Sequence, residues 1–112
     1  MRTTIALIGT GLLVLWLSAA ALAGAPETFA GKCAGCHGKD GKGQTAMGKK
    51  LNIKDLTDAK VQAAAKDADW EKVITDGAKD AGGKVVMYGS KGKISPEDIK
   101  GLVKVCRDFK GK

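Results

Sequence analysis

The sequence predicts a small all-α domain of three to five short helices, on the basis of three observations. Apolar residues recur at helical spacing through residues 95–109, and helix-start signals occur at further places in the chain. No alternation of apolar and polar residues typical of strands is visible, nor is any internal repeat. Residues 33–37 read Cys-Ala-Gly-Cys-His, which is typical of covalent haem attachment. A large apolar cofactor would supply core volume to a chain of only 112 residues.

Residues 1–23 are predicted to be a cleaved secretory signal peptide and not part of the fold. A basic residue follows the initiating methionine, an apolar run extends over residues 5–17, and Ala21-Leu22-Ala23 fits the small-x-small cleavage pattern. The run is shorter than the ~20 residues that span a bilayer as a helix. We expect export to the periplasm and cleavage after Ala23, which leaves a domain of residues 24–112. An uncleaved N-terminal anchor is the alternative.

Residues 25–35 are expected to form the first helix, which delivers the Cys-x-x-Cys-His stretch to the edge of the haem. Pro26 stands near the first helical position and an acidic residue follows it, and both are helix-start signals. Phe29 and Cys33 are four residues apart, so they share one face of this helix.

Each residue type in the Cys-x-x-Cys-His stretch has a role in haem attachment. The thiols of Cys33 and Cys36 can add to the two vinyl groups of haem as thioethers, and His37 offers an imidazole to the iron. His37 is the single histidine of the chain, so no other imidazole can serve. A thioredoxin-like dithiol and a zinc site are alternatives. The first lacks a βαβ pattern, and the second finds only Cys106 as a fourth ligand.

Two Gly- and Lys-rich stretches, residues 38–55 and 79–94, are predicted to be loops, and each contains one methionine that could bind the iron. Met47 follows the attachment stretch so closely that reaching the opposite haem face needs a tight path round the ring edge. Met87 lies in an apolar island of the second loop, with enough preceding chain to wrap round a small cofactor. We therefore expect Met87 to be the distal ligand; Met47 as ligand, or Met87 as a gap-filling core residue, are the alternatives.

Two helices are expected between these loops. Thr57 and Asp58 are candidate caps for an alanine-rich helix that runs to about Lys66. A second helix is expected to begin at the Asp-Ala-Asp sequence that follows and to end at Gly77. Trp70 lies on its apolar face and is expected in the core, near or against the haem.

Residues 95–109 form the most strongly predicted helix. Ser95 offers an N-cap and Pro96 suits the first helical position. The apolar stripe consists of Ile99, Leu102, Val103, Cys106 and Phe109. Because Cys106 belongs to this stripe, it is expected to be a small buried core residue; an intermolecular disulfide or a reactive thiol is the alternative.

Taken together, these features resemble the class I monohaem cytochromes c, in particular the small soluble bacterial ones. The resemblance covers essentially the whole chain after residue 23. The stretches that carry it are Cys33–His37, Gly38–Gly43, Met87 in its loop, and Lys93–Ile99 followed by Leu102 and Val103. Ala46 and Tyr88 depart from the family pattern, because relatives often have proline at these places, where it helps to rigidify the haem surroundings.

The resemblance implies a compact all-α cytochrome c fold in which the first and last helices cross beside one covalently attached haem c. Cys33 and Cys36 would carry the thioether links, His37 would be the proximal iron ligand and Met87 the distal one. An iron with histidine and methionine ligands has no open position, so the site favours electron transfer over catalysis, and we do not expect an enzyme.

The expected function is that of a monomeric, soluble periplasmic protein that shuttles single electrons between redox partner proteins. The formal net charge of +7 comes almost wholly from lysine and suits partners with acidic docking surfaces. Nucleic-acid binding is not expected, because no basic aromatic module is present, and no stable membrane anchor is expected after cleavage. The alternatives are a subunit through which electrons enter a specific dehydrogenase or reductase complex, and a haem enzyme or gas sensor with a labile Met87.

Overall fold

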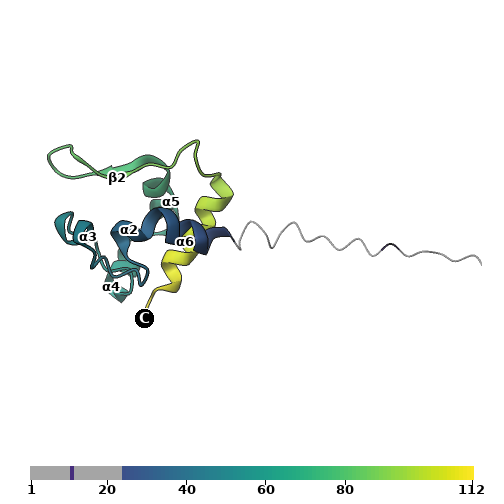
Figure 1. Ribbon diagram of the computed structural model, residues 1–112, viewed down its shortest axis with the longest axis horizontal. Helices are drawn as coiled ribbons and strands as arrows, with labels where there is room; N and C mark the ends of the chain where they lie inside the picture. Colours follow the sequence, from purple (N-terminus) through teal and green to yellow (C-terminus); the bar gives the residue numbers. More distant parts are fainter. Residues whose placement is uncertain (1–10, 12–23) are drawn as a thin grey trace, which may run out of the picture.

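The computed structural model describes Gly11 and residues 24–112 (Figure 1). Gly11 aside, the predicted signal peptide and its cleavage point after Ala23 lie outside the described residues. Within the described part of the chain, no helix is long and apolar enough to cross a membrane. All the helices and strands reported below lie in residues 24–112.

The first helical segment has three consecutive stretches, which alternate between two hydrogen-bonding patterns. Residues 24–28 are α-helical, η1 (Phe29–Cys33) is a π-helix, and α2 (Ala34–His37) is α-helical again. The amide of Ala34 donates to the carbonyl of Phe29, five residues earlier, which is the wider spacing of a π-helix. The first predicted helix is therefore confirmed, and it continues through the whole Cys-x-x-Cys-His stretch.

The last helix, α6 (Pro96–Asp108), forms as its sequence predicts. The hydroxyl of Ser95 accepts a hydrogen bond from the amide of Asp98 at 3.2 Å, and Pro96 occupies the start of the helix. The predicted stripe faces inward. Its buried members are Ile99, Leu102 and Val103, and its half-buried members are Cys106 and Phe109.

The first helical segment crosses α6 at two small residues (Figure 1). A Cβ added to Gly101 would lie 3.1 Å from the Cβ of Ala25, so glycine at this position lets the two helices approach closely. The aromatic rings of Phe29 and Phe109 pack 5.2 Å apart, tilted by 49°. The core cluster formed by these elements consists of Ala25, Phe29, Ala34 and Leu102. The crossing of the first and last helices is the arrangement that the family resemblance implies.

The stretch predicted as a loop at residues 38–55 contains a short helix, so that prediction was wrong in part. Helix α3 (Ala46–Lys50) begins after Thr45, whose hydroxyl accepts a hydrogen bond from the amide of Gly48 at 2.8 Å. This cap satisfies one of the N–H groups that have no partner in the first turn of a helix. With five residues and no apolar periodicity, α3 leaves little trace in the sequence.

Helix α4 (Ala59–Ala64) forms where the alanine-rich helix was predicted, but it is shorter. The carboxylate of Asp58 accepts a hydrogen bond from the amide of Lys60 at 2.8 Å, so Asp58 is its cap. The helix does not reach Lys66, because Ala65 adopts an extended backbone conformation.

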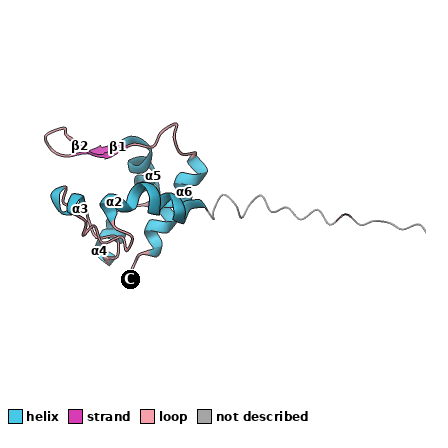
Figure 2. Cartoon of the chain, viewed as in Figure 1, coloured by secondary structure: helices cyan, strands magenta, loops and turns pink. Residues whose placement is uncertain are grey.

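Helix α5 (Asp67–Asp76) ends at Gly77, as predicted, where the backbone takes a φ of 82°. It leads directly into a two-stranded antiparallel hairpin of β1 (Gly77–Lys79) and β2 (Val85–Tyr88), shown in Figure 2. The prediction of a loop over residues 79–94 was therefore wrong for the stretch that contains β2. The predicted helical architecture is confirmed, and the hairpin is added to it.

Candidate cofactor site

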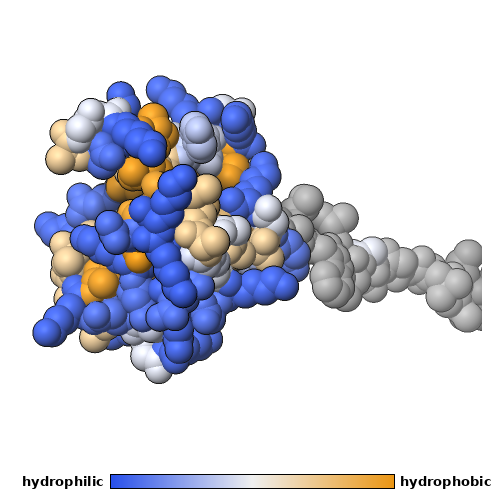
Figure 3. Space-filling view, turned by 60° about the vertical axis from the view of Figure 1, so that its left-hand side comes forward, coloured by the Kyte–Doolittle hydropathy of each residue, from blue (hydrophilic) through white to orange (hydrophobic). Residues whose placement is uncertain are grey.

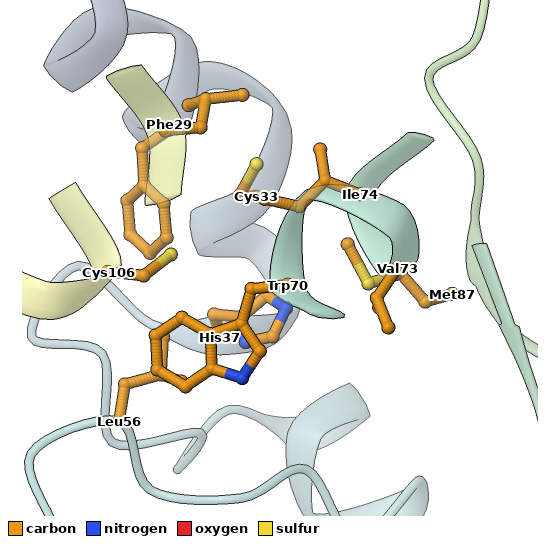
Figure 4. Close-up of a pocket in the computed structure, with 10 residues that line it drawn as sticks. Phe29, Cys33, His37, Leu56, Trp70, Val73, Ile74, Met87 and Cys106 are labelled. Carbon is orange, nitrogen blue, oxygen red and sulfur yellow. The ribbon is translucent and has the colours of Figure 1, made fainter. Parts of the chain in front are cut away.

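An apolar pocket lies between the hairpin, α5 and the two crossing helices. Figure 3 shows hydrophobic side chains gathered in a hollow of a surface that is otherwise largely hydrophilic. Together with space that is open to solvent, the pocket holds about 530 Å³ that no protein atom fills. The lining residues, drawn in Figure 4, are Phe29, Cys33, His37, Leu56, Trp70, Val73, Ile74, Met87, Leu102 and Cys106.

Segments that are far apart in the chain meet in this pocket. Cys33 and His37 come from the first helical segment, and Met87 comes from β2. In Figure 4, Met87 enters from the side of the hairpin, while Cys33 and His37 lie on the first helical segment. Cys36, the other predicted attachment residue, is half-buried on α2 and does not line the pocket. The structure thus brings three of the four predicted site residues into one pocket.

The imidazole of His37 is held in apolar surroundings. Its Nδ1 atom is buried and has no hydrogen-bond partner among the residues that the structure describes. Burial lowers the pKa of His37 below its ordinary value, because the charged imidazolium loses hydration. The neutral form is the one that binds a metal. His37 lines the pocket, so its imidazole is placed to act as a ligand to a group held there.

The loop after the attachment stretch holds that stretch by its backbone carbonyls. The hydroxyl of Thr45 donates to the carbonyl of Cys36 at 2.7 Å, and the amide of Gly43 donates to the carbonyl of His37 at 2.7 Å. Gly48 packs so closely that an added Cβ would lie 2.7 Å from the carbonyl oxygen of Cys36. We call Gly43, Thr45 and Gly48 the motif clamp. Sequence reasoning missed it, and its one signal was a threonine in front of α3.

The two candidate methionines lie in different surroundings. Met47, on α3, is 44% exposed and does not line the pocket. Met87 is half-buried and lines it. The placement of these side chains favours Met87 over Met47 as a ligand to a group in the pocket.

Met87 is held in position by the hairpin and by the end of α5. In the antiparallel ladder it lies opposite Ala78. Beyond β2, the amide of Ser90 donates to the carbonyl of Ile74 at 2.9 Å, and the next amide makes a similar bond to α5. These bonds use carbonyls that are left free at the end of a helix. The neighbouring Tyr88 is 84% exposed, so the side chains of Met87 and Tyr88 lie on opposite faces of the strand.

Cys106 lines the pocket as a half-buried core residue, in agreement with its predicted place on the apolar stripe. Burial raises the pKa of its thiol from 9.0 to about 12, and the nearby Cys33 adds to the rise. The neutral thiol is therefore stabilised, and a reactive thiolate is disfavoured.

Cys106 is expected to make the stability of the fold decrease at high pH. Its pKa is higher in the folded than in the unfolded chain, so its contribution to the free energy of unfolding is complete below pH 9.0 and decreases as the pH rises toward 12. Denaturant unfolding of the wild type and of Cys106→Ala, below and within this range, measures the effect. The difference in the free energy of unfolding between the two proteins should become smaller at high pH. A difference that stays constant over this range contradicts the prediction.

The donor set and the shape of the pocket fit a covalently attached haem. A thiol, an unpartnered imidazole and a thioether face one apolar cavity, supplied by Cys33, His37 and Met87. The zinc alternative requires converging donors. Across residue 11 and residues 24–112, no group of three or more His, Cys, Asp and Glu side chains is placed to hold a metal ion.

A mostly helical fold with crossing terminal helices, and a Cys-x-x-Cys-His stretch beside an apolar pocket, defines a c-type cytochrome. The chain belongs to the cytochrome c family, whose sequence profile matches residues 23–104. Members of this family carry covalently bound haem c and are typically electron carriers outside the cytoplasm. The family assignment replaces the dithiol and zinc alternatives.

Solved structures of c-type cytochromes resemble the chain over most of its length. The KustC0563 c-type cytochrome has 32% sequence identity and a TM-score of 0.68, and the match covers 77% of this chain and 96% of that one. A mutant of Kustc0563 has 34% identity and a TM-score of 0.66, and the match covers 77% and 98% of the two chains. No curated protein matches the sequence.

Proposed function

We propose that this protein is a periplasmic electron carrier that holds one haem c through Cys33 and Cys36 and binds its iron through His37 and Met87. The observation that carries the proposal is the meeting of Cys33, His37 and Met87 in one apolar pocket, although Met87 comes from a distant hairpin. The chemistry supplied by the bound haem is the exchange of one electron between ferric and ferrous iron.

The chain's own residues have distinct tasks in this function. The thiols of Cys33 and Cys36 fix the cofactor covalently, so it cannot dissociate. His37 and Met87 would hold the iron of the bound haem and would leave it no open position for a substrate, and ligation by methionine would raise its reduction potential. The apolar lining, with Trp70 among it, excludes water and so tunes the potential further.

An absorbance spectrum of the exported protein tests the proposal. We expect sharp low-spin c-type bands in both redox states, with a far-red iron–sulfur band that disappears in Met87→Ala. The reduced wild type should refuse carbon monoxide, and the variant should bind it, because the substitution opens one axial position. The matched control is Met47→Ala, at an exposed position, which should keep the wild-type spectrum. Haem bands that Met87→Ala leaves unchanged would refute Met87 as ligand and return catalysis or gas sensing to consideration.

The partner class we propose is redox proteins with acidic docking surfaces. The chain carries 19 basic and 12 acidic residues. Exposed lysines stand on α3 and on the hairpin: Lys49, Lys50, Lys79 and Lys84. Redox partners of opposite charge form short-lived complexes, and they associate faster at low salt. Electron exchange with an acidic partner should therefore slow as ionic strength rises, and no salt dependence would contradict the proposal. Gel filtration distinguishes a free monomer from a subunit of fixed stoichiometry.

A further inference from the structure

Arg107, near the end of α6, reaches across to the junction between α4 and α5. Its Nη2 atom donates to the carbonyl of Ala65 at 2.7 Å, and Nη1 donates to the carbonyl of Gln62 and, at 3.1 Å, to its Oε1 atom. Its Nε atom donates to the carboxylate of Asp67 at 2.7 Å. The two carbonyls belong to the C-terminal end of α4, where they lack helical partners. One guanidinium group therefore joins three helices.

The same guanidinium group stacks on Trp70. Its central carbon lies 3.9 Å from the centroid of the indole ring, a distance typical of a cation–π contact. Trp70 is half-buried on α5 and lines the haem pocket together with His37 (Figure 4). The planar, delocalised group is suited to this contact, because it can stack and donate in its plane at once. Arg107 therefore contacts a wall of the pocket.

The surface ion pair is the weakest part of this arrangement. The side chain of Asp67 is 68% exposed, so its attraction to Arg107 is screened by water. Arg107 itself is only 24% exposed, and its other contacts are with backbone carbonyls and the indole ring. Gln62, which accepts hydrogen bonds from Arg107, is itself held to α6, because its side-chain amide donates to the carbonyl of Cys106 at 2.9 Å. The orientation of Arg107 is thus fixed from several directions.

We propose that Arg107 is a positioning residue that holds Trp70 in the wall of the haem pocket and in this way sets the reduction potential of the bound haem. This inference rests on the proposed function. The potential of a haem protein depends on how well the pocket excludes water and on the polarity around the iron. A ring pinned between its own helix and the guanidinium keeps water out; a ring that is free to move admits it and favours the oxidised protein.

A double-mutant cycle on the exported, haem-loaded protein tests this inference. Arg107→Lys keeps the positive charge but removes the planar fork and the stack. At a fixed ambient potential, we expect this substitution to lower the ratio of reduced to oxidised protein roughly threefold or more. A change of this size corresponds to the lower part of the range of interaction energies between residues in contact. In a Trp70→Leu background the same substitution should leave the ratio unchanged, because Arg107 acts through Trp70.

Two control variants separate position from charge and from the ion pair. Lys104→Gln removes an exposed positive charge from α6, and Asp67→Asn removes the surface ion pair; both leave the stack in place. Each should change the ratio by less than about twofold, as expected of exposed charges. If Lys104→Gln or Asp67→Asn changes the ratio as much as Arg107→Lys, the proposal is overturned, because substitutions that leave the stack in place would then affect the potential equally.

A second measurement keeps the inference testable if Trp70→Leu does not fold. Near-ultraviolet circular dichroism of Arg107→Lys should show loss of the fixed tryptophan signal, with the far-ultraviolet spectrum retained. With normal haem bands, either of two results would overturn the positioning role. One is an unchanged tryptophan signal in Arg107→Lys, and the other is an equal effect of Arg107→Lys on the ratio with and without Trp70. Absence of haem bands in the wild type would instead overturn the proposed function.

Discussion

Replacing both Cys33 and Cys36 with alanine is expected to abolish covalent haem binding and to unfold most of the domain. The pocket beside Cys33 has an apolar lining, so without the cofactor these side chains lack the group that they pack against. Only seven buried hydrophobic residues form the core among the residues that the structure describes. A chain this small has little surplus stability to offset that loss.

Haem staining of a denaturing gel and far-ultraviolet circular dichroism measure the two effects. The double variant should show no protein-bound haem and little helix, whereas Cys36→Ala alone should retain haem through Cys33. Cys106→Ala is the matched control, since Cys106 is a free thiol that lines the same pocket. It should keep its covalent haem. Haem that stays bound to the denatured double variant, or is lost from Cys106→Ala, would show that the attachment residues are assigned wrongly.

Gly48→Ala is expected to destabilise the protein by disrupting the motif clamp. The added Cβ would lie 2.7 Å from the carbonyl oxygen of Cys36 and would also meet the backbone of Gly43. These are backbone atoms that cannot rotate away, so the two segments must separate. Overpacking of this kind costs roughly 1–3 kcal/mol of the free energy of unfolding. The hydrogen bond from Thr45 to Cys36 should lengthen as well, which loosens the attachment stretch.

Gly31→Ala is the control for this substitution, because no atom lies within 4 Å of a Cβ added there. Gly31 stands within the first helical segment, where alanine should stabilise the helix by about 0.5–1 kcal/mol. Denaturant unfolding of the two variants and the wild type should therefore give changes of opposite sign. Equal stabilities for Gly48→Ala and Gly31→Ala would mean that the close packing in the clamp does not constrain the fold.

Local signals explain why parts of the fold were predictable from the sequence. The start of α6 is marked by Ser95 and Pro96, which act on the backbone within a few residues of themselves. Its buried face follows from the helical spacing of the apolar stripe, and the structure buries that face. The end of α5 follows from Gly77, because glycine adopts positive φ at little cost.

Elements that lack such local signals were missed. Helix α3 has five residues, and its cap, Thr45, also serves as a donor to Cys36 in another segment. The strands of the hairpin have three and four residues, and their pairing is interrupted by a bulge. The strands are therefore too short and irregular to show an alternation of apolar and polar residues in the sequence. Short elements of this kind are stabilised by contacts with the rest of the fold more than by their own propensity.

The sequence by itself determined the chemistry and the frame of this protein. The sequence predicts the attachment roles of Cys33, Cys36 and His37 and the inward face of α6 from nearby residues, because thioether spacing and helical periodicity are local properties. The sequence favoured Met87 over Met47, but only the tertiary structure placed Met87 in the pocket and Arg107 against Trp70 in its wall. Both depend on contacts between segments that are distant in the chain: Met87 is carried to the pocket by a hairpin bonded to α5, and Arg107 on α6 contacts Trp70 on α5.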